Sequence, residues 1–468
     1  MDMYVVVVSE GIYMGKVIMR EEPYVCIPTS SDPLCQRCFK SGDALLKCAS
    51  CNIAWYCGAE CQRLDWKLHK LECRAISRLE KKWQELVTRT PEIRLMVKLF
   101  IRRKLQRDKV IPTTPIDNFD LVEAMIDHQS NMESEKLAEY QIMAQIVNHM
   151  LQQPELDLDE AVNIFCKLSC NAHAIVDIAM EPLGIGLYPV MSVINHSCLP
   201  NAILVFEGKL AVLRALAPVE KGDEVIHVLI SYIDLSRTTR HRQDDLNGKY
   251  HFTCTCPRCS KFAEIDDQIL DALRCKEGEC NGFFVTKDRS YSRDQKLECN
   301  KCGLIQTSEA ERSAKGIIDR LCDKGKSDFF SDNFQEAVST FKRAEEAALD
   351  LFHPSSFSVM MVRNLLTKLY TTIGDTRAAL ESCRLMTPVH ERLLQTLNPV
   401  RGMHYLTRGM LEWVEGNRGD GRNYLVRAGD ILLLTHGTNF PLVKELLINL
   451  AKDHAELAKK QEGGPSGS

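Results

Sequence analysis

The sequence has no long apolar run, and no stretch reaches the roughly 20 residues that a membrane-spanning helix needs. Its start lacks the basic residues and the apolar length of a secretion signal, because the valines at 5–8 are flanked by acidic residues. A strong charge of one sign is also missing, since the formal net charge is -4. These absences argue against a membrane-embedded or secreted protein and against a general attraction to nucleic acid. We therefore expect a protein of the nucleus, the cytoplasm or both.

Cysteine, in contrast, is abundant, with 20 cysteines among 468 residues. The nucleus and cytoplasm keep thiols reduced, so metal binding explains this number better than disulfides do. Most of the cysteines fall into three clusters, at 35–73, at 198 with 254–259, and at 275–302. The chain is also longer than one hydrophobic core usually organises, so we expect several domains.

The first cluster has seven cysteines and one histidine at the spacings of zinc ligands. These residues are Cys35, Cys38, Cys48, Cys51, Cys57, Cys61, His69 and Cys73. Eight such ligands serve two tetrahedral zinc ions. A segment of about 40 residues is too small to fold on a core of its own, so bound metal would stabilise it. Six basic against four acidic residues in this segment argue only weakly for DNA binding.

The other two clusters predict one further zinc site each. Cys254, Cys256 and Cys259 need a fourth ligand, for which Cys198 is the natural donor. If Cys198 were instead a small buried apolar residue, that site would stay open. The third cluster has the form of a zinc ribbon built on two knuckles, and its members are Cys275, Cys280, Cys299 and Cys302. We expect three or four structural zinc ions in total.

Apolar periodicity divides the rest of the chain into helical and strand-forming parts. Residues 74–165 have apolar positions at helical spacing and should be mainly helical. Short apolar runs at 202–206 and 210–213, separated by turn residues, predict strands.

Beyond residue 310 the sequence is helical again and contains a weak repeat. Asp332, Gly374 and Gly416 recur every 42 residues, each ahead of an apolar stretch. This period fits stacked helix pairs of the tetratricopeptide kind, and it fits a plain helical bundle equally well. The Gly-, Ser- and Pro-rich end predicts a disordered tail.

Three motifs give the sequence a likeness to a known family. Residues 195–201 read Asn-His-Ser-Cys-Leu-Pro-Asn, residues 222–225 read Gly-Asp-Glu-Val, and Ser231 precedes Tyr232. Together with the first cysteine cluster and the Cys-x-Cys-x2-Cys at 254–259, they resemble the SET-and-MYND (SMYD) protein lysine methyltransferases, in particular the plant branch.

This resemblance implies an α+β fold, with a SET β-fold interrupted by a MYND zinc finger and a helical insert. It implies the following parts: a truncated N-terminal part of the SET domain (1–34), the MYND finger (35–73), the helical SET insert (74–165), the SET core (166–253), a post-SET and zinc-ribbon-like segment (254–309), a TPR-like helical lobe (310–460) and the disordered tail (461–468).

The resemblance also implies roles for individual residues. The finger would bind one ion through Cys35, Cys38, Cys57 and Cys61, and the other through Cys48, Cys51, His69 and Cys73. The cofactor S-adenosylmethionine would be contacted by Asn171, Asn195, His196, Tyr232 and Phe252. Tyr232 and Tyr250 would serve catalysis, Tyr232 by orienting the amine and Tyr250 by lining the lysine channel.

The implied activity is methyl transfer to lysines of histones or other proteins. Protein partners would bind through the finger and the helical lobe, with no membrane and no direct nucleic-acid binding, and the chain would be a monomer. Two departures from the family pattern motivate an inactive binding scaffold as the alternative. The start lacks a Gly-x-Gly strand, and residues 226–230 form a link about three residues longer than usual, which could shift the register of Tyr232.

A third hypothesis is a zinc-dependent transcription factor, motivated by the fingers and by the basic residues at 102–109. We expect that basic run to form a solvated helix face instead.

Overall fold

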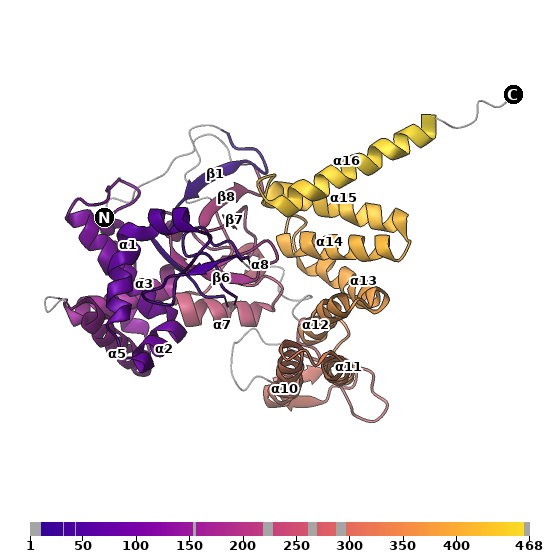
Figure 1. The fold of residues 1–468 in the computed structure, drawn as a ribbon. Helices are drawn as coiled ribbons and strands as arrows, with labels where there is room; N and C mark the ends of the chain where they lie inside the picture. Colours follow the sequence, from indigo (N-terminus) through magenta and orange to yellow (C-terminus); the bar gives the residue numbers. More distant parts are fainter. Residues whose placement is uncertain are drawn as a thin grey trace. The chain divides into compact units, whose positions relative to one another are not determined.

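The computed structural model describes residues 11–30, 32–42, 44–152, 156–218, 228–260, 269–286 and 296–462. The chain separates into two compact units (Figure 1). The first unit comprises Met1–Asn195, Asn201–Ile230 and Asn247–Phe252, and the second comprises His196–Pro200, Ser231–Leu246 and Thr253–Ser468. The motif at 195–201 therefore contributes residues to both units.

Two three-stranded antiparallel sheets form most of the β structure of the first unit. Their strand orders are β1-β8-β7 and β2-β6-β5. The strands are β1 (Val17–Glu21), β2 (Val25–Pro28), β5 (Ala172–Val176), β6 (Pro182–Leu187), β7 (Ala202–Glu207) and β8 (Leu210–Ala215). The two strands predicted at 202–206 and 210–213 are confirmed, as the hairpin of β7 and β8. Met19 of β1 lies opposite Leu213 of β8, so the N-terminal part of the chain completes this sheet.

Helices cover most of the chain from residue 59 to 171. They are α1 (Ala59–Ser77), α2 (Lys81–Arg89), α3 (Pro91–Arg107), α4 (Phe119–Glu123), η1 (Gln129–Asn131), α5 (Ser134–Leu151) and α6 (Leu158–Asn171). α3 is buried on every side from residue 93 to 101, as expected for a helix in the middle of a core. Two of these buried residues, Arg94 and Lys98, are basic, so the fold must supply them with partners.

The expectation that residues 102–109 form a solvated basic face is wrong for the first two of them. Arg102 donates to Asp117 at 2.6 Å and to the backbone carbonyls of Pro23 and Tyr24. Arg103 donates to Glu160 at 2.6 Å. These two cations connect α3 to its surroundings and are therefore already paired within the fold.

The second unit has a four-stranded antiparallel sheet, of order β12-β11-β10-β9, followed by a series of long helices. Its elements are α8 (Pro257–Ser260), β9 (Leu273–Arg274), β10 (Phe283–Thr286), β11 (Lys296–Cys299), β12 (Ile305–Thr307), α10 (Ser308–Phe330), α11 (Phe334–Leu351), α12 (Phe357–Ile373), α13 (Thr376–Leu393), α14 (Pro399–Val414), α15 (Arg418–Thr435) and α16 (Pro441–Glu462). The residues of α7 (Thr239–Tyr250) are divided between the two units.

The 42-residue repeat marks the turns of three helix pairs. Asp332, Gly374 and Gly416 lie between α10 and α11, α12 and α13, and α14 and α15, and all three have left-handed backbone angles, with φ of 58°, 80° and 85°. Such a residue ends a helix and reverses the chain. Each pair also packs on the next, α11 against α12 and α13 against α14 (Figure 1). This order favours the TPR-like arrangement over a plain bundle.

Within the described ranges, no helix combines the length and the apolarity that crossing a membrane would need. Some segments for which the sequence made predictions lie partly or wholly outside the described residues. Residues 461 and 462 belong to α16, and the rest of the predicted tail, 463–468, lies outside the described residues. The same holds for residues 1–10 and for the motif at 222–225.

Candidate functional site

The structure brings the ligands of the first cysteine cluster together in two sets of four, and each set has its ligand atoms within 4.8 Å of one another. One set is Cys35, Cys38, Cys57 and Cys61, and the other is Cys48, Cys51, His69 and Cys73. This is the pairing that the family resemblance implied. The Cys48 and Cys73 sulfurs are 3.8 Å apart, which is the separation expected for two sulfurs bound at about 2.3 Å to one tetrahedral zinc ion. A disulfide would need about 2.05 Å.

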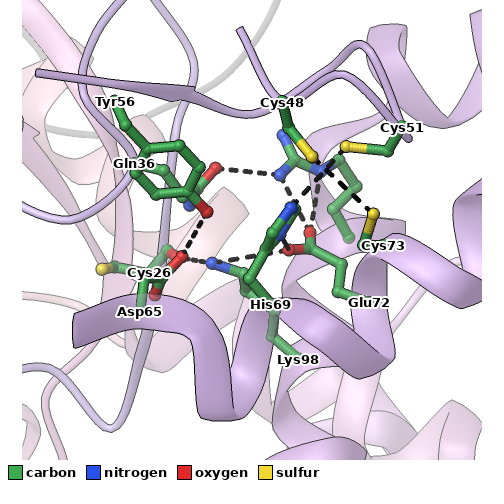
Figure 2. Close-up of polar contacts among 11 residues, drawn as sticks. Cys26, Gln36, Cys48, Cys51, Tyr56, Asp65, His69, Glu72, Cys73 and Lys98 are labelled. Carbon is green, nitrogen blue, oxygen red and sulfur yellow. Dashed lines mark hydrogen bonds and ion pairs between the residues drawn. The ribbon is translucent and has the colours of Figure 1, made fainter. Parts of the chain in front are cut away.

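The second of these sites is supported by a buried carboxylate that sequence reasoning missed. Glu72 Oε2 is 3.2 Å from His69 Nδ1, whereas His69 Nε2 faces Cys51 at 3.7 Å (Figure 2). A carboxylate on the far nitrogen of a ligand histidine fixes the orientation of the ring toward the metal. Burial by itself would raise the pKa of Glu72, but the charges of Lys98 and Arg94 hold it well below its usual range.

Arg94 and Lys98 extend this network to the sheet. Arg94 Nη2 lies 2.9 Å from Glu72 and 3.0 Å from Gln36 Oε1. Lys98 Nζ lies 3.8 Å from Glu72 and 3.5 Å from the Cys26 carbonyl of β2 (Figure 2). Three thiolates, one neutral imidazole and Zn²⁺ have a formal charge of -1. Together with Glu72 they balance the two buried cations, so the metal site and α3 complement each other electrostatically.

We predict that Glu72→Gln destabilises the first unit by about 2 kcal/mol, because buried Arg94 loses a charged hydrogen-bond partner and buried Lys98 loses its ion pair. Chemical denaturation of the zinc-loaded protein measures this. Glu139→Gln is the matched control, since Glu139 forms an exposed ion pair with Lys136 at 2.7 Å and such pairs contribute little. Equal stability of the two variants would contradict the role of the network.

The four cysteines predicted to form the next zinc site also converge. Cys198, Cys254, Cys256 and Cys259 have their sulfurs within 4.8 Å of one another, and all four belong to the second unit. Two side chains of α7 support them. Arg242 is only 1% exposed and its Nη2 lies 3.8 Å from Cys259 Sγ, where its charge offsets that of four thiolates. Gln243 accepts from the Cys254 N–H at 2.8 Å and donates to the Cys254 carbonyl at 2.7 Å.

His196 connects this site to Tyr232. The Tyr232 backbone N–H donates to His196 Nδ1 at 3.1 Å, and the two rings are 5.2 Å apart. Burial lowers the pKa of His196 to about 4, so near pH 7 the ring is neutral and its one proton is on Nε2. That nitrogen lies 3.4 Å from Cys198 Sγ. A ligand thiolate thus sets the position of the imidazole, and the imidazole sets the position of the Tyr232 backbone.

The other expected cofactor residues lie in the first unit. Asn195 is exposed, and its carbonyl accepts from the Ile230 N–H at 3.0 Å. The turn before it, η2 (Met191–Val193), is fixed by Glu21, whose carboxylate accepts from the backbone N–H groups of Val190 and Met191 at 2.9 and 2.8 Å. Burial raises the pKa of Glu21 to about 7, although these two hydrogen bonds lower it.

Asn171 and Tyr250 are the last residues of helices, and Phe252 lies two residues beyond the end of α7. Asn171 is the last residue of α6, and its Nδ2 donates to the carbonyls of Ile126 and Lys167 at 2.9 and 2.8 Å. Its amide nitrogen is therefore already bound to backbone. Tyr250 ends α7, and both Tyr250 and Phe252 are half-buried.

The long link before Ser231 is described only from Val228 onward. Val228 and Ile230 are buried, and the Leu229 N–H donates to Asn201 Oδ1 at 2.7 Å while its carbonyl accepts from the Asn201 N–H at 3.1 Å. The end of the link is therefore fixed to the last residue of the motif at 195–201. Residues 226 and 227 of the link lie outside the described residues.

Comparisons with known proteins identify the family of the chain. Residues 35–73 match the MYND finger family. The chain is 40% identical to the histone-lysine N-methyltransferase ASHR1 of Arabidopsis thaliana, over 96% of this chain and 92% of that protein. It is 26% identical to the mouse N-lysine methyltransferase SMYD2 (93% and 92%) and 25% identical to the mouse histone-lysine N-methyltransferase SMYD3 (95% and 93%). With its finger, its SET motifs and this full-length similarity, the chain belongs to the SET-and-MYND family of protein-lysine N-methyltransferases.

Proposed function

We propose that the chain transfers methyl groups from S-adenosylmethionine to lysine side chains of other proteins, histones among them. The observation that supports this proposal is the placement of Tyr232, whose backbone is held by His196 of the motif at 195–201. The proposed substrate class follows the names of the relatives, which state histone-lysine or N-lysine methyl transfer. An inactive scaffold is the weaker alternative, because relatives named as enzymes align with more than nine-tenths of the chain.

When bound, S-adenosylmethionine supplies an electrophilic methyl group on a sulfonium. The chain has to align the lysine nitrogen with that methyl group and present the amine without its proton. A narrow apolar channel lowers the pKa of the amine from its usual value of about 10.4. In our proposal Tyr250 lines this channel, and the Tyr232 hydroxyl orients the amine.

Asn195, His196 and Asn171 would bind the methionine part of the cofactor, and Phe252 would pack on the adenine edge. The exposed side chain of Asn195 is available for such a contact. Because Asn171 Nδ2 is bound to backbone carbonyls, Asn171 would use its Oδ1. The zinc ions of the MYND finger and of the Cys198 site are structural in this proposal, since the transfer requires no metal.

Incorporation of labelled methyl groups into recombinant histones and into a cell lysate, followed by mass spectrometry, tests the proposal. We expect methylated lysine in at least one substrate and binding of S-adenosylmethionine by titration calorimetry. If the zinc-loaded protein neither binds S-adenosylmethionine nor labels any protein, the scaffold alternative describes it better.

We predict that Asn195→Ala weakens S-adenosylmethionine binding about tenfold, because the cofactor loses one amide hydrogen bond worth about 1 kcal/mol or more. Zinc content and the melting temperature without ligand should stay unchanged, since this side chain is exposed. Calorimetry and thermal unfolding measure the two properties separately. A parallel fall of both would make Asn195 a structural residue.

A further inference from the structure

The third cysteine cluster forms a compact site in the second unit. Its four sulfurs lie within 4.8 Å of one another, and the pairs Cys275 with Cys302 and Cys280 with Cys299 are each 3.7 Å apart. The sheet of β9 to β12 produces this arrangement, because Cys275 follows β9 directly and Cys299 ends β11. These separations match the edges of a tetrahedron around zinc, about 3.8 Å, and are far too long for a disulfide.

The loops around these cysteines are shaped to bring the sulfurs together. Gly278 and Gly303 have φ of 51° and 76°, which permits the tight turn in each knuckle. The Lys301 N–H points at Cys299 Sγ from 3.5 Å. Gly282 leaves the space that this sulfur occupies, since a Cβ atom there would come within 2.6 Å of it. A non-ligand position is therefore also constrained by the site.

The sheet packs on the first helix pair of the TPR-like lobe. Leu273 of β9 forms a β-bridge with Phe352, which follows α11. The His353 N–H donates to the Ala272 carbonyl at 2.9 Å, and Arg274 Nη2 donates to the Leu349 carbonyl at 3.3 Å. Apolar side chains from the sheet and from the helices share one core, namely Leu273, Phe284, Leu297, Ile318, Phe341 and Phe352.

This packing places the sheet next to the first helix pair of the TPR-like lobe. The later helix pairs pack on one another in chain order, whereas α10 and α11 form the first pair of the lobe within the described residues and contact β12 and β9. A repeat array needs such a cap, because its terminal repeat would otherwise expose its apolar face.

We propose that Cys275, Cys280, Cys299 and Cys302 bind a further structural zinc ion, and that the resulting zinc ribbon is the N-terminal cap of the TPR-like lobe. The sheet is too small to be stable without the ion. Metal loss should therefore increase local unfolding of α10 and α11 first and leave the distant pair of α14 and α15 folded. This role is independent of methyl transfer.

The test compares the full-length protein with a Cys299→Ser/Cys302→Ser variant. We expect bound zinc to fall from four ions to three per chain, and amide exchange in α10 and α11 to become at least ~10-fold faster, with α14 and α15 unchanged. Cys322→Ala is the matched control, because Cys322 is buried in the same core but is not among the four ligands. It should keep all four ions.

Two further variants cover the case in which the double variant does not fold. Cys302→His replaces an exposed ligand by another zinc ligand and should retain the ion. Gly282→Ala removes no ligand but should lower zinc occupancy by displacing Cys299. Unchanged zinc content in the double variant, or disulfides among these four cysteines in freshly isolated protein, would overturn the metal site. Zinc loss with unchanged exchange in α10 and α11 would overturn the cap.

Discussion

Replacing Cys256 by serine should release one zinc ion and unfold the segment around residues 253–260. A structural zinc site contributes ~10 kcal/mol or more of apparent binding energy, which is more than a short segment with one four-residue helix can replace. The loss should reach beyond this segment, because the same ion would hold Cys198 and, through it, His196. Metal analysis and limited proteolysis near residue 256 measure the two effects.

Cys170→Ser is a suitable comparison for this variant, since Cys170 is a partly buried thiol outside the four ligand sets. It should keep the zinc content and the proteolysis pattern of the parent protein. If Cys256→Ser retains its zinc, Cys256 is not a required ligand and the four-cysteine site that we assign is wrong.

The second large effect is expected for Tyr232→Phe, which keeps the ring and removes only the hydroxyl. If the hydroxyl orients the amine in the transition state, turnover should fall about 100-fold or more. This is the effect typical for the loss of one contact to the transition state. Binding of S-adenosylmethionine should change little, because the interaction is made mainly at the barrier. The backbone N–H of Tyr232 still donates to His196 in this variant, so the fold should be unaffected.

Single-turnover and steady-state rates of methyl transfer measure this effect, with an unmethylated protein that has been identified beforehand as a substrate. Tyr13→Phe, at a residue that is 67% exposed, controls for the loss of a tyrosine hydroxyl. A fully active Tyr232→Phe variant would remove Tyr232 from catalysis. If, in addition, deletion of residues 226–228 raised methyl transfer, this chain would be a register-shifted form with little activity. Because the side chain of Val228 is buried, we expect this deletion to lower the stability of the protein and not to raise methyl transfer.

The sequence predicted those parts of the molecule whose chemistry is encoded at short spacing. Zinc ligands are one example, because Cys-x2-Cys pairs have to lie on the same small loop. The turns of the helical repeat are another, and their 42-residue period corresponds to three left-handed residues. In both cases local residue type determines local geometry.

The buried network of Glu72, Arg94 and Lys98 could not be predicted in this way. Arg94 and Gln36 are 58 positions apart and meet only after the finger has packed on α3. One signal was available, since two basic residues stand among the apolar positions of a helix that is buried on every side. The same tertiary packing explains why Arg102 and Arg103 are paired and not solvated. The roles of Asn171, Tyr250 and Phe252 stay predictions, as they depend on a bound ligand.

The short chain from Cys198 through the His196 ring to the Tyr232 N–H has a practical consequence for inhibitor discovery. Under the proposed function, a compound that strips zinc from the Cys198 site would displace the tyrosine without competing for S-adenosylmethionine or for the substrate lysine. In a screen that reads only product formation, such a compound would score as a potent hit. Its inhibition would not be relieved by excess S-adenosylmethionine or by excess substrate, and added zinc would reverse it.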